Sequence, residues 1–300
     1  MPDPRQHHHV TAGHLAGFTD KGTRDGKLFV LSLSKSRWRG PLRPEKVATR
    51  RDFNRVEIPD EDPYYVEKRL GELLDGPAAP LMHALTASPR VPSDEEFNIL
   101  LNFVSLQMTR SPRFRERARR ALVENMAAAI GEKTKTLEGF KKLVDEMRAA
   151  GTLKEEVAYE ELQELLKEAP ELLKPSRTIQ IIQMLLEMNR VFQLNRERYW
   201  TLAISDGPDF ICSDSPATII HLRPGIRDEL AACAVVMPVS KRIMLVGSPR
   251  PAPRALIPAD SDYVADMNRT TAHGATELYA PAPVVHGIET PAWSPRSQRP

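Results

Sequence analysis

The spacing of apolar residues changes character along this 300-residue chain. Residues 27–33 are mostly apolar, which predicts a strand buried on both faces. Between residues 63 and 195, apolar residues recur at three- and four-residue intervals, and this spacing predicts helices. From residue 199 to 247 the apolar period is two, which predicts strands, and residues 261–279 return to helical spacing.

Capping and breaking residues divide the helical middle. Ser93-Asp94-Glu95-Glu96 is a capping box, in which the Ser93 side chain and the Glu96 carboxylate satisfy backbone N–H groups at the start of a helix. Pro112 is expected to kink or interrupt that helix. Gly151 is expected to end one charged helix before the next begins.

Three further segments have a predicted conformation. Residues 34–54 are basic and contain two prolines, so we expect them to be irregular. Residues 179–192 are apolar on several faces, which predicts a central helix. Residues 200–204 and 210–212 alternate around Asp206-Gly207, and this dipeptide favours a tight turn, so we expect a hairpin.

Together these elements predict one α+β domain over residues 1–280. In it, a central helical bundle packs on a mixed, mainly antiparallel sheet formed by C-terminal strands plus an N-terminal strand. The helical middle spans 63–195, the strand-rich part 199–247 and the final helix 261–279, and the Pro-rich residues 281–300 are expected to form a flexible tail. Two separate domains are the alternative, because closure of the N-terminal strand onto the sheet is itself inferred.

Composition narrows the class of protein. A hydrophobic content of 41% provides enough apolar material for a core, and a net charge of +2 is too small to indicate nucleic acid or membrane binding by itself. Two cysteines in apolar runs do not make a disulfide framework, which favours a reducing cytoplasm. The chain has no apolar run of membrane-spanning length and no secretory signal pattern, so we expect a soluble cytoplasmic protein.

Histidines concentrate before the first predicted strand. His7, His8, His9 and His14 lie within fifteen residues, and no repeating apolar face explains them. Neutral imidazole serves as a metal ligand or as a general base, and we treat His8 as the candidate for either role. The alternative is that His8 bonds a backbone carbonyl and fixes the N-terminus. No established metal-binding spacing of histidines or cysteines accompanies it, so a divalent metal is a hypothesis only.

Gln107 and Arg110 lie one turn apart on the helix that begins after Ser93. Polar groups that border an apolar stripe need partners when they are buried. Arg110 is therefore a candidate clamp for a phosphate or carboxylate group, and Gln107 a candidate substrate-binding residue. The alternative for Arg110 is an internal salt bridge to Glu67 or Asp214.

Further candidates come from the strand-rich half and the helices. Asp214 follows a predicted strand, where a carboxylate is well placed to bind metal or orient a histidine, although an Asx turn before Pro216 is the simpler interpretation. Glu67 is either a catalytic carboxylate or part of a solvated helix face. Asn268 is either a ligand hydrogen-bonding residue or a helix-surface residue.

A basic run follows Pro112 and offers a candidate nucleic-acid contact. Its charges suggest a phosphate-backbone footprint, or else a solvated helix surface. The arginines of this run are Arg113, Arg115, Arg117, Arg119 and Arg120.

Several different short motifs follow one another along most of the chain. They are His8-His9-Val10-Thr11 followed by Leu15 and Phe18, Asp52-Phe53-Asn54, Val66-Glu67 with Leu70, Gln107-Met108-Thr109-Arg110-Ser111-Pro112, Ser213-Asp214-Ser215-Pro216, Met237-Pro238-Val239-Ser240 and Asn268. In this order they resemble domain-of-unknown-function family 4238, which typically opens with His-Tyr-Val-Pro and carries Gln-x-x-Arg-x-Pro and Ser-Asp-Asn-Pro elements. Thr11, Asn54 and Ser215 depart from that pattern. The resemblance implies the fold and the location of a site, and no particular activity.

Two hypotheses for function follow. In the first, the protein is a hydrolase acting on a phosphate-containing or nucleic-acid substrate. His8, Glu67 and Asp214 would then bind metal or move protons, and Arg110 would stabilise negative charge. In the second, the protein is a non-catalytic binding, defence or stress-related module, and the same polar residues form a structural network. Convergence of His8, Glu67, Arg110, Asp214 and Asn268 on one open pocket would favour the first.

Overall fold

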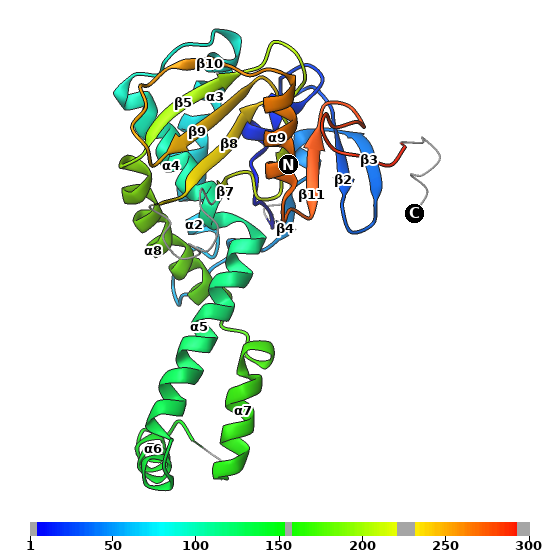
Figure 1. The fold of residues 1–300 in the computed structure, drawn as a ribbon. Coiled ribbons are helices and arrows are strands. Elements are labelled where there is room, and N and C mark those ends of the chain that lie inside the picture. The colour runs from blue at the N-terminus through cyan, green and yellow to red at the C-terminus, as the bar shows by residue number, and fades with distance from the viewer. Residues whose placement is uncertain (1–4, 154–157, 221–231, 293–300) are drawn as a thin grey trace.

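The computed structural model describes residues 5–153, 158–220 and 232–292. It confirms the predicted α+β class: a body of sheets and helices carries a projecting helical stalk (Figure 1). Within the described residues, the strands form sheets of five, four and two strands. No described helix has the length and apolarity needed to cross a membrane.

The five-stranded sheet has the order β10-β5-β9-β8-β7. Its strands are β5 Tyr199–Ile204, β7 Thr218–Ile220, β8 Ala234–Ser240, β9 Ile243–Ser248 and β10 Leu256–Pro258. β10 runs parallel to β5, and the other pairs are antiparallel, so the sheet is mixed and mainly antiparallel as predicted. Every residue of β8 is buried, because helices or neighbouring elements cover both faces of the sheet.

Helices cover this sheet on its two faces. α3 Gly76–Ala87, α4 Asp94–Arg110 and α8 Arg177–Arg196 contribute to one core cluster with β5, β8 and β9. α9 Ser261–Ala272 packs on the other face, where Val264 joins Ala203, Val236 and Met244. The alternation of neighbouring strand residues between these two clusters is the period-two pattern expected of strands.

The four-stranded sheet joins the two ends of the chain. β2 Leu28–Ser32 pairs with β3 Arg37–Leu42 on one side and with β11 Glu277–Ala280 on the other, and β11 also pairs with β6 Cys212–Ser213. The N-terminal strand therefore pairs with a C-terminal strand, as predicted, although it does so in a sheet separate from the five-stranded one.

The third sheet is a two-stranded ribbon of β1 Gln6–His8 and β4 Thr49–Arg51. Short helical segments surround it. They are α1 Ala12–Leu15, η1 Ala16–Phe18, η2 Pro44–Lys46, α2 Tyr65–Leu70 and the π-helical turn η3 Gly71–Asp75, which leads directly into α3.

The stalk consists of α5 Pro112–Lys133, α6 Leu137–Ala149 and α7 Tyr159–Leu172 (Figure 1). α4 and α5 are separate helices, because α4 ends at Arg110, Ser111 caps α5 and Pro112 occupies its first turn. Arg119 of α5 donates to the carbonyl oxygens of Pro170 and Leu173, at 2.9 Å and 2.8 Å, and thereby attaches the C-terminal end of α7 to α5.

The capping box of α4 is confirmed, with reciprocal hydrogen bonds between Ser93 and Glu96. Two other local predictions are wrong. The segment 34–54 contains β3 and β4 rather than irregular chain, and Pro41 is accommodated because β3 is an edge strand. Residues 200–204 and 210–212 do not form a hairpin, because β5 pairs with β9 and β10 whereas β6 pairs with β11.

The C-terminal predictions also need correction. The final helix ends at Ala272, not at 279, because residues 277–280 form β11 inside the four-stranded sheet. Residues 281–292 pack on the body instead of forming a loose tail, and Val285 is buried. Residues 293–300 lie outside the described part. α8 is not central, since Ile179, Ile182 and Leu186 are exposed.

Candidate functional site

The two-stranded ribbon places the N-terminal histidines beside β4. His7 is opposite Arg50 and His8 is opposite Thr49, and the backbone N–H of His9 donates to the Ala48 carbonyl at 2.9 Å. His7 and His9 are buried, whereas His8 is partly exposed. The ribbon therefore brings imidazoles and arginines from distant parts of the sequence to one location.

Backbone strain marks both ends of β4. Ala48 and Asp52 have positive φ values of 54° and 56°, which is the left-handed region that non-glycine residues seldom adopt. Each such residue costs about 1–3 kcal/mol, and such strain clusters at functional sites. The strained residues enclose the three residues of β4 and thus fix where Arg50 and Arg51 lie.

Asn54 connects three of the surrounding side chains. Its side chain is fully buried, its amide nitrogen donates to the Glu67 carboxylate, and its amide oxygen accepts a hydrogen bond from Arg115. Its backbone N–H donates to Nδ1 of His7 at 2.8 Å. Glu67 therefore holds Asn54 rather than facing solvent alone, and Asn54 in turn orients Arg115.

Arg115 lies buried under the ribbon. Its guanidinium carbon is 3.5 Å from the centre of the Phe53 ring, and it also donates to the Phe53 carbonyl. Burial and the nearby charge of Arg110, partly opposed by Glu67, together lower the pKa of Arg115 to about 9. Arg115 is thus a buried cation whose charged form is destabilised by its surroundings.

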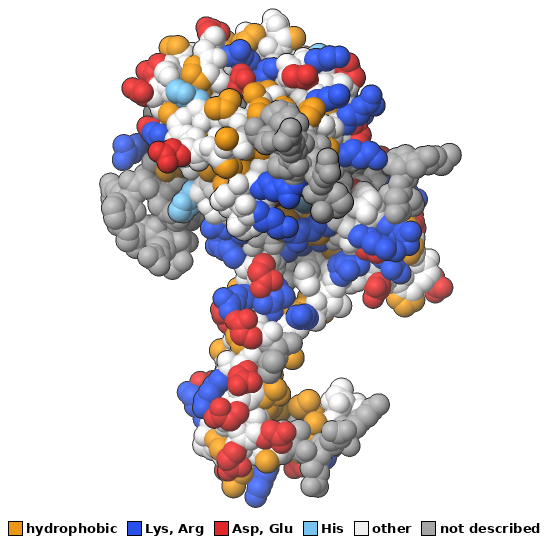
Figure 2. Space-filling view, turned by 90° about the vertical axis from the view of Figure 1, so that its right-hand side faces the viewer, with side chains coloured by type: hydrophobic (Ala, Val, Ile, Leu, Met, Phe, Trp, Pro, Cys, Tyr) orange, Lys and Arg blue, Asp and Glu red, His pale blue; other side chains and the backbone are white. Residues whose placement is uncertain are grey.

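An open cleft of about 410 Å³ lies against Arg115, and we call it the arginine cleft. Arg50, Arg51 and Arg177 contribute exposed guanidinium groups to it, and Phe53 forms part of its wall. Within the described residues, Arg50 and Arg177 have no carboxylate partner, and the one acidic lining residue, Glu116, is bonded by Arg119 at 2.7 Å. The remaining lining residues are Pro112, Pro175 and Gln180. Figure 2 shows Lys and Arg side chains gathered where the stalk leaves the body.

Arg110 lies deeper and is fully buried. It makes a bidentate pair with Asp75, with N–O distances of 2.8 Å and 3.1 Å, and Asp75 ends η3. The expectation of an internal salt bridge is therefore met by Asp75 and not by Glu67 or Asp214. The Nε of Arg110 has no partner among the described residues.

Gln107 and Phe103 share a face of α4 with Arg110, at helical spacings of three and four residues. Gln107 is fully buried, and both polar atoms of its amide lack a hydrogen-bond partner among the described residues. The Phe103 ring contacts the His14 ring, with centroids 5.3 Å apart. Gln107 thus lies between a residue that touches His14 and one that binds Asp75.

The histidines near Arg110 are held neutral. Burial, partly opposed by the hydrogen bond to the Pro238 carbonyl, and the charge of Arg110 together lower the pKa of His14 to about 4. Burial and then the charges of Arg50 and Arg110 lower the pKa of His9 to about 3. Burial and the charges of Arg110 and Arg24 lower the pKa of His8 to about 4. Burial is the main cause of all three shifts, and the positive charges of nearby arginines act in the same direction.

The predicted metal role of His8 finds no supporting geometry. Among the described residues, no group of three or more His, Cys, Asp or Glu side chains is arranged to hold a metal ion. Among the described residues, His8 has no hydrogen bond to a backbone carbonyl either, whereas Nε2 of His14 lies 2.7 Å from the Pro238 oxygen and Nε2 of His286 lies 3.0 Å from the Ser261 oxygen.

Asp214 lies in a different hydrogen-bond network. Its carboxylate accepts hydrogen bonds from the backbone N–H groups of Thr276 and Glu277 and from the Thr276 hydroxyl. Within the described part of the chain it makes no hydrogen bond or ion pair with His8, Glu67 or Arg110. The structure therefore does not join Asp214 to the other predicted catalytic residues, and it gives Asp214 a local role before β11.

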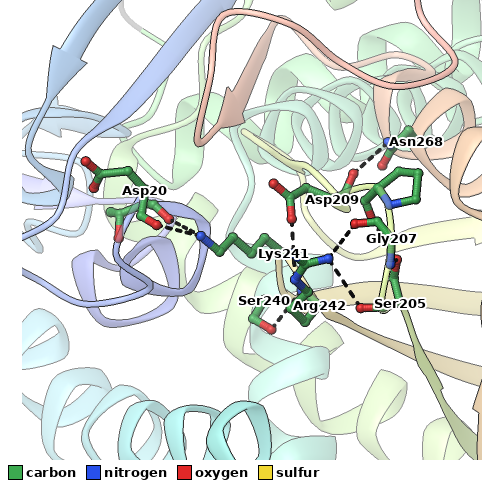
Figure 3. Close-up of polar contacts among 10 residues, drawn as sticks. Asp20, Ser205, Gly207, Asp209, Ser240, Lys241, Arg242 and Asn268 are labelled. Atoms are coloured by element: carbon green, nitrogen blue, oxygen red, sulfur yellow. Dashed lines mark hydrogen bonds and ion pairs between the residues drawn. The ribbon is translucent and has the colours of Figure 1, made fainter.

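Asn268 also has structural partners. Its side-chain oxygen accepts from the Ile211 N–H at 3.0 Å, and its amide nitrogen donates to the carbonyls of Asp209 and His286, both at 3.1 Å. Figure 3 shows the neighbouring polar contacts, in which Lys241 and Arg242 at the β8–β9 turn reach backbone carbonyls of adjacent loops. Both polar atoms of the Asn268 amide are bonded, so Asn268 fixes neighbouring loops, whereas Oδ1 of Asp209 makes only an ion pair with Arg242 and no hydrogen bond among the described residues.

The arginines of α5 do not form one exposed stripe. Arg115 and Arg119 are buried with internal partners, Arg113 donates to the His273 carbonyl, and Arg120 pairs with Glu171. Only Arg115 among them lines the arginine cleft. Four arginines of the basic run therefore form hydrogen bonds or ion pairs within the protein.

The family model described as "Protein of unknown function (DUF4238)" matches residues 6–279. This chain belongs to that family. No curated protein and no solved structure matches it. The match covers the ribbon, α4 and both larger sheets, so the residues that surround the arginine cleft fall within the family region.

The arginine cleft and the buried polar residues near it include both predicted and unpredicted residues. Gln107 and Arg110 come from a motif that the sequence alone indicated. Arg50, Arg177, Asp75 and Asn54 were not predicted as site residues, although Arg50 lies in the basic segment 34–54 and Asn54 in the Asp52-Phe53-Asn54 motif. Asn54 is also one of the three departures from the family pattern, and the structure gives that position a central place in the network.

Proposed function

We propose that this protein binds a phosphate-containing ligand in the arginine cleft. The observation that carries the proposal is the convergence of Arg50 from β4 and Arg177 from α8 on one cleft beside buried Arg115. Arg50 and Arg177 have no carboxylate partner within the described residues, so their hydrogen-bond donors are available. Guanidinium groups match phosphate oxygens in pairs and stay charged at every physiological pH.

Electrostatics support an anion as the occupant. Besides burial, which is the largest cause, the charges of Arg110, Arg177 and Arg50 lower the pKa of Arg115, so each of these cations repels Arg115. A bound phosphate would place negative charge among them and remove this repulsion. The strained residues Ala48 and Asp52 also have a function in this proposal, because they hold β4 so that Arg50 faces the cleft.

Isothermal titration with inorganic pyrophosphate and with ATP tests the proposal. The double variant Arg50→Gln and Arg177→Gln removes two charges without touching the core, and we expect it to weaken binding by about tenfold or more. Arg37→Gln is the matched control, since Arg37 is an exposed arginine on the edge strand β3. Binding should also weaken as ionic strength rises.

Equal affinities of the wild type and the double variant would remove the arginine cleft from binding. An equal loss in Arg37→Gln would indicate that net charge, and not the cleft, attracts the anion. Absence of measurable binding of both probes to the wild type would contradict the proposal itself.

Hydrolysis of a phosphate ester is a second candidate, favoured by His8. Its imidazole is neutral and partly exposed, it lies near the charge of Arg110, and its Nδ1 has no partner among the described residues. A neutral imidazole beside fixed cations would accept a proton from an attacking water. Metal analysis of the purified protein, together with a phosphodiesterase and nuclease panel, compares the wild type with His8→Ala. Retained binding with lost turnover in His8→Ala would favour hydrolysis, and equal turnover would exclude His8 from it.

A further inference from the structure

A second group of buried polar side chains lies near Arg110. It consists of the side chains of His9, His14 and Gln107 and the Nε of Arg110, and we call it the inner cluster. These side chains are 5%, 1%, 0% and 0% exposed, respectively. His9 Nδ1, His14 Nδ1, both amide atoms of Gln107 and Arg110 Nε have no hydrogen-bond partner among the described residues. Each buried polar group left in this way costs about 1–3 kcal/mol.

Independent contacts bring these side chains together. His14 touches Phe103, one turn before Gln107 on the same face of α4. α1 packs so closely on α3 that a Cβ on Gly13 would lie 2.7 Å from the Cβ of Ala79, one turn beyond Asp75. Asp75 binds Arg110, so the stretch of η3 and α3 that contains Asp75 and Ala79 contacts both α1 and the Arg110 end of α4. Arg110 also lowers the pKa values of both His9 and His14.

Hydrogen bonding fixes what the inner cluster offers. The Pro238 carbonyl can only accept, so Nε2 of His14 carries the proton that bonds it. In the neutral ring the other nitrogen, Nδ1, is then an acceptor. Gln107 supplies both donors and an acceptor, and Nε of Arg110 supplies a donor. The group that best satisfies adjacent donors and acceptors of this kind is a hydroxyl, which donates one hydrogen bond and accepts others.

One aromatic side chain links the inner cluster to the arginine cleft. The Phe53 ring lines the cleft and lies edge-on to the His9 ring, with centroids 6.0 Å apart. Arg115 stacks over the same Phe53 ring, and Arg50, which lines the cleft, acts electrostatically on both His9 and Arg115. Phe53 therefore contacts both the arginine cleft and His9, one member of the inner cluster.

We propose that the inner cluster recognises hydroxyl groups of the ligand whose phosphate occupies the arginine cleft, so that the ligand is a hydroxylated phosphate ester, such as a sugar phosphate or a nucleoside phosphate. This inference rests on the proposed function, because it takes phosphate binding in the cleft as given. It adds that inorganic phosphate is only part of what the protein recognises. Gln107 is the residue that distinguishes a hydroxylated phosphate ester from inorganic phosphate.

Titration calorimetry with inorganic phosphate, ribose 5-phosphate and AMP tests the inference. We expect the wild type to bind ribose 5-phosphate at least about tenfold more tightly than inorganic phosphate. Gln107→Leu should reduce the affinity for ribose 5-phosphate to that for inorganic phosphate, and leave the latter unchanged. Comparison of AMP with ribose 5-phosphate then distinguishes a nucleoside phosphate from a sugar phosphate as the source of the hydroxyl groups.

Gln107→Leu also has a readout without ligand. Because it replaces an unsatisfied buried amide with an apolar side chain of similar size, the variant should melt at the same temperature as the wild type or higher. Gln107→Met is the second variant, in case the branched leucine does not fit. Equal affinity for all three probes, or an equal loss for inorganic phosphate and ribose 5-phosphate in both variants, would overturn the inference and leave phosphate binding intact. Failure of every probe to bind the wild type would overturn the proposed function as well.

Discussion

Two regions of this molecule contain buried polar residues, and they differ in how those residues are satisfied. Around Asp214 and Asn268, each side chain bonds backbone groups of neighbouring loops. Around Gln107 and His14, buried donors and acceptors are left without partners among the described residues, and the surrounding charges are positive. Sequence motifs had indicated both regions as parts of one site.

The difference shows which buried polar residues indicate a ligand. A satisfied network fixes loops, because every hydrogen bond is already made within the protein. An unsatisfied amide in a folded protein is unfavourable unless something else binds it. Burial and polarity alone therefore do not distinguish a structural residue from a binding residue, whereas the state of the hydrogen bonds does.

The largest expected effect concerns the pair that borders the inner cluster. Arg110→Ala leaves Asp75 without its cation and opens space in a packed core, so we expect the free energy of unfolding to fall by about 3 kcal/mol. Denaturation with urea measures this loss. Lys68→Ala, which breaks an exposed pair with Asp62, should reduce the free energy of unfolding far less, because water screens that pair. Similar losses in the two variants would contradict the assignment of Arg110 as a buried, structurally required charge.

The next effect is a loss of stability in acid. The folded pKa of His14 is about 4, below the ordinary value of 6.5, so the unfolded state binds more protons as the pH falls below 6.5. His14 alone should then lower the free energy of unfolding by about 2 kcal/mol between pH 7 and pH 5. His8 and His9 act with the same sign. Urea denaturation at several pH values compares the wild type with His14→Gln, in which this part of the pH dependence should be absent.

A smaller effect tests the satisfied region. Asp214→Asn replaces a charged acceptor of two backbone N–H groups and a hydroxyl, so we expect the free energy of unfolding to fall by about 1–2 kcal/mol. Pyrophosphate affinity should not change. Asp262→Asn on the exposed surface of α9 serves as the control. A weaker affinity for pyrophosphate in Asp214→Asn, measured by calorimetry, would bring Asp214 back into the site.

The smallest effect on stability belongs to the arginine cleft. Arg50 and Arg177 are exposed and have no carboxylate partner within the described residues. Replacing both with Gln should therefore change the free energy of unfolding by about 0.5 kcal/mol or less, and the melting temperature correspondingly little. A higher melting temperature would fit relief of repulsion with Arg115. Marked destabilisation, measured by differential scanning fluorimetry, would show that these residues are structural.

Local patterns predicted much of the fold. The capping box at Ser93 located the start of α4, because both of its hydrogen bonds form within four residues. Pro112 located the break between α4 and α5 for an equally local reason. The pairing of β5 could not be predicted in this way: Asp206-Gly207 favoured a hairpin, but β9 and β10 pair with β5 over distances that no local pattern encodes.

Part of the candidate site was also predictable. Arg110 and Gln107 stood out because polar residues interrupt an apolar helix face. The partner of Arg110 was not predictable, since Asp75 lies thirty-five positions earlier in the chain and meets Arg110 only after η3 and α4 pack together. Arg50 and Arg177 are in the same situation, because a cleft between β4 and α8 exists only in the folded chain.

The sequence by itself determined the α+β class, the helix boundaries at Ser93 and Pro112, and the family. These features depend on residues close together in the chain or on the order of short motifs. The tertiary structure decided which polar residues share a site, because burial and hydrogen-bond satisfaction depend on neighbours that are distant in sequence. It separated Asp214 and Asn268 from His14, Gln107 and Arg110, and it added the arginines of the cleft.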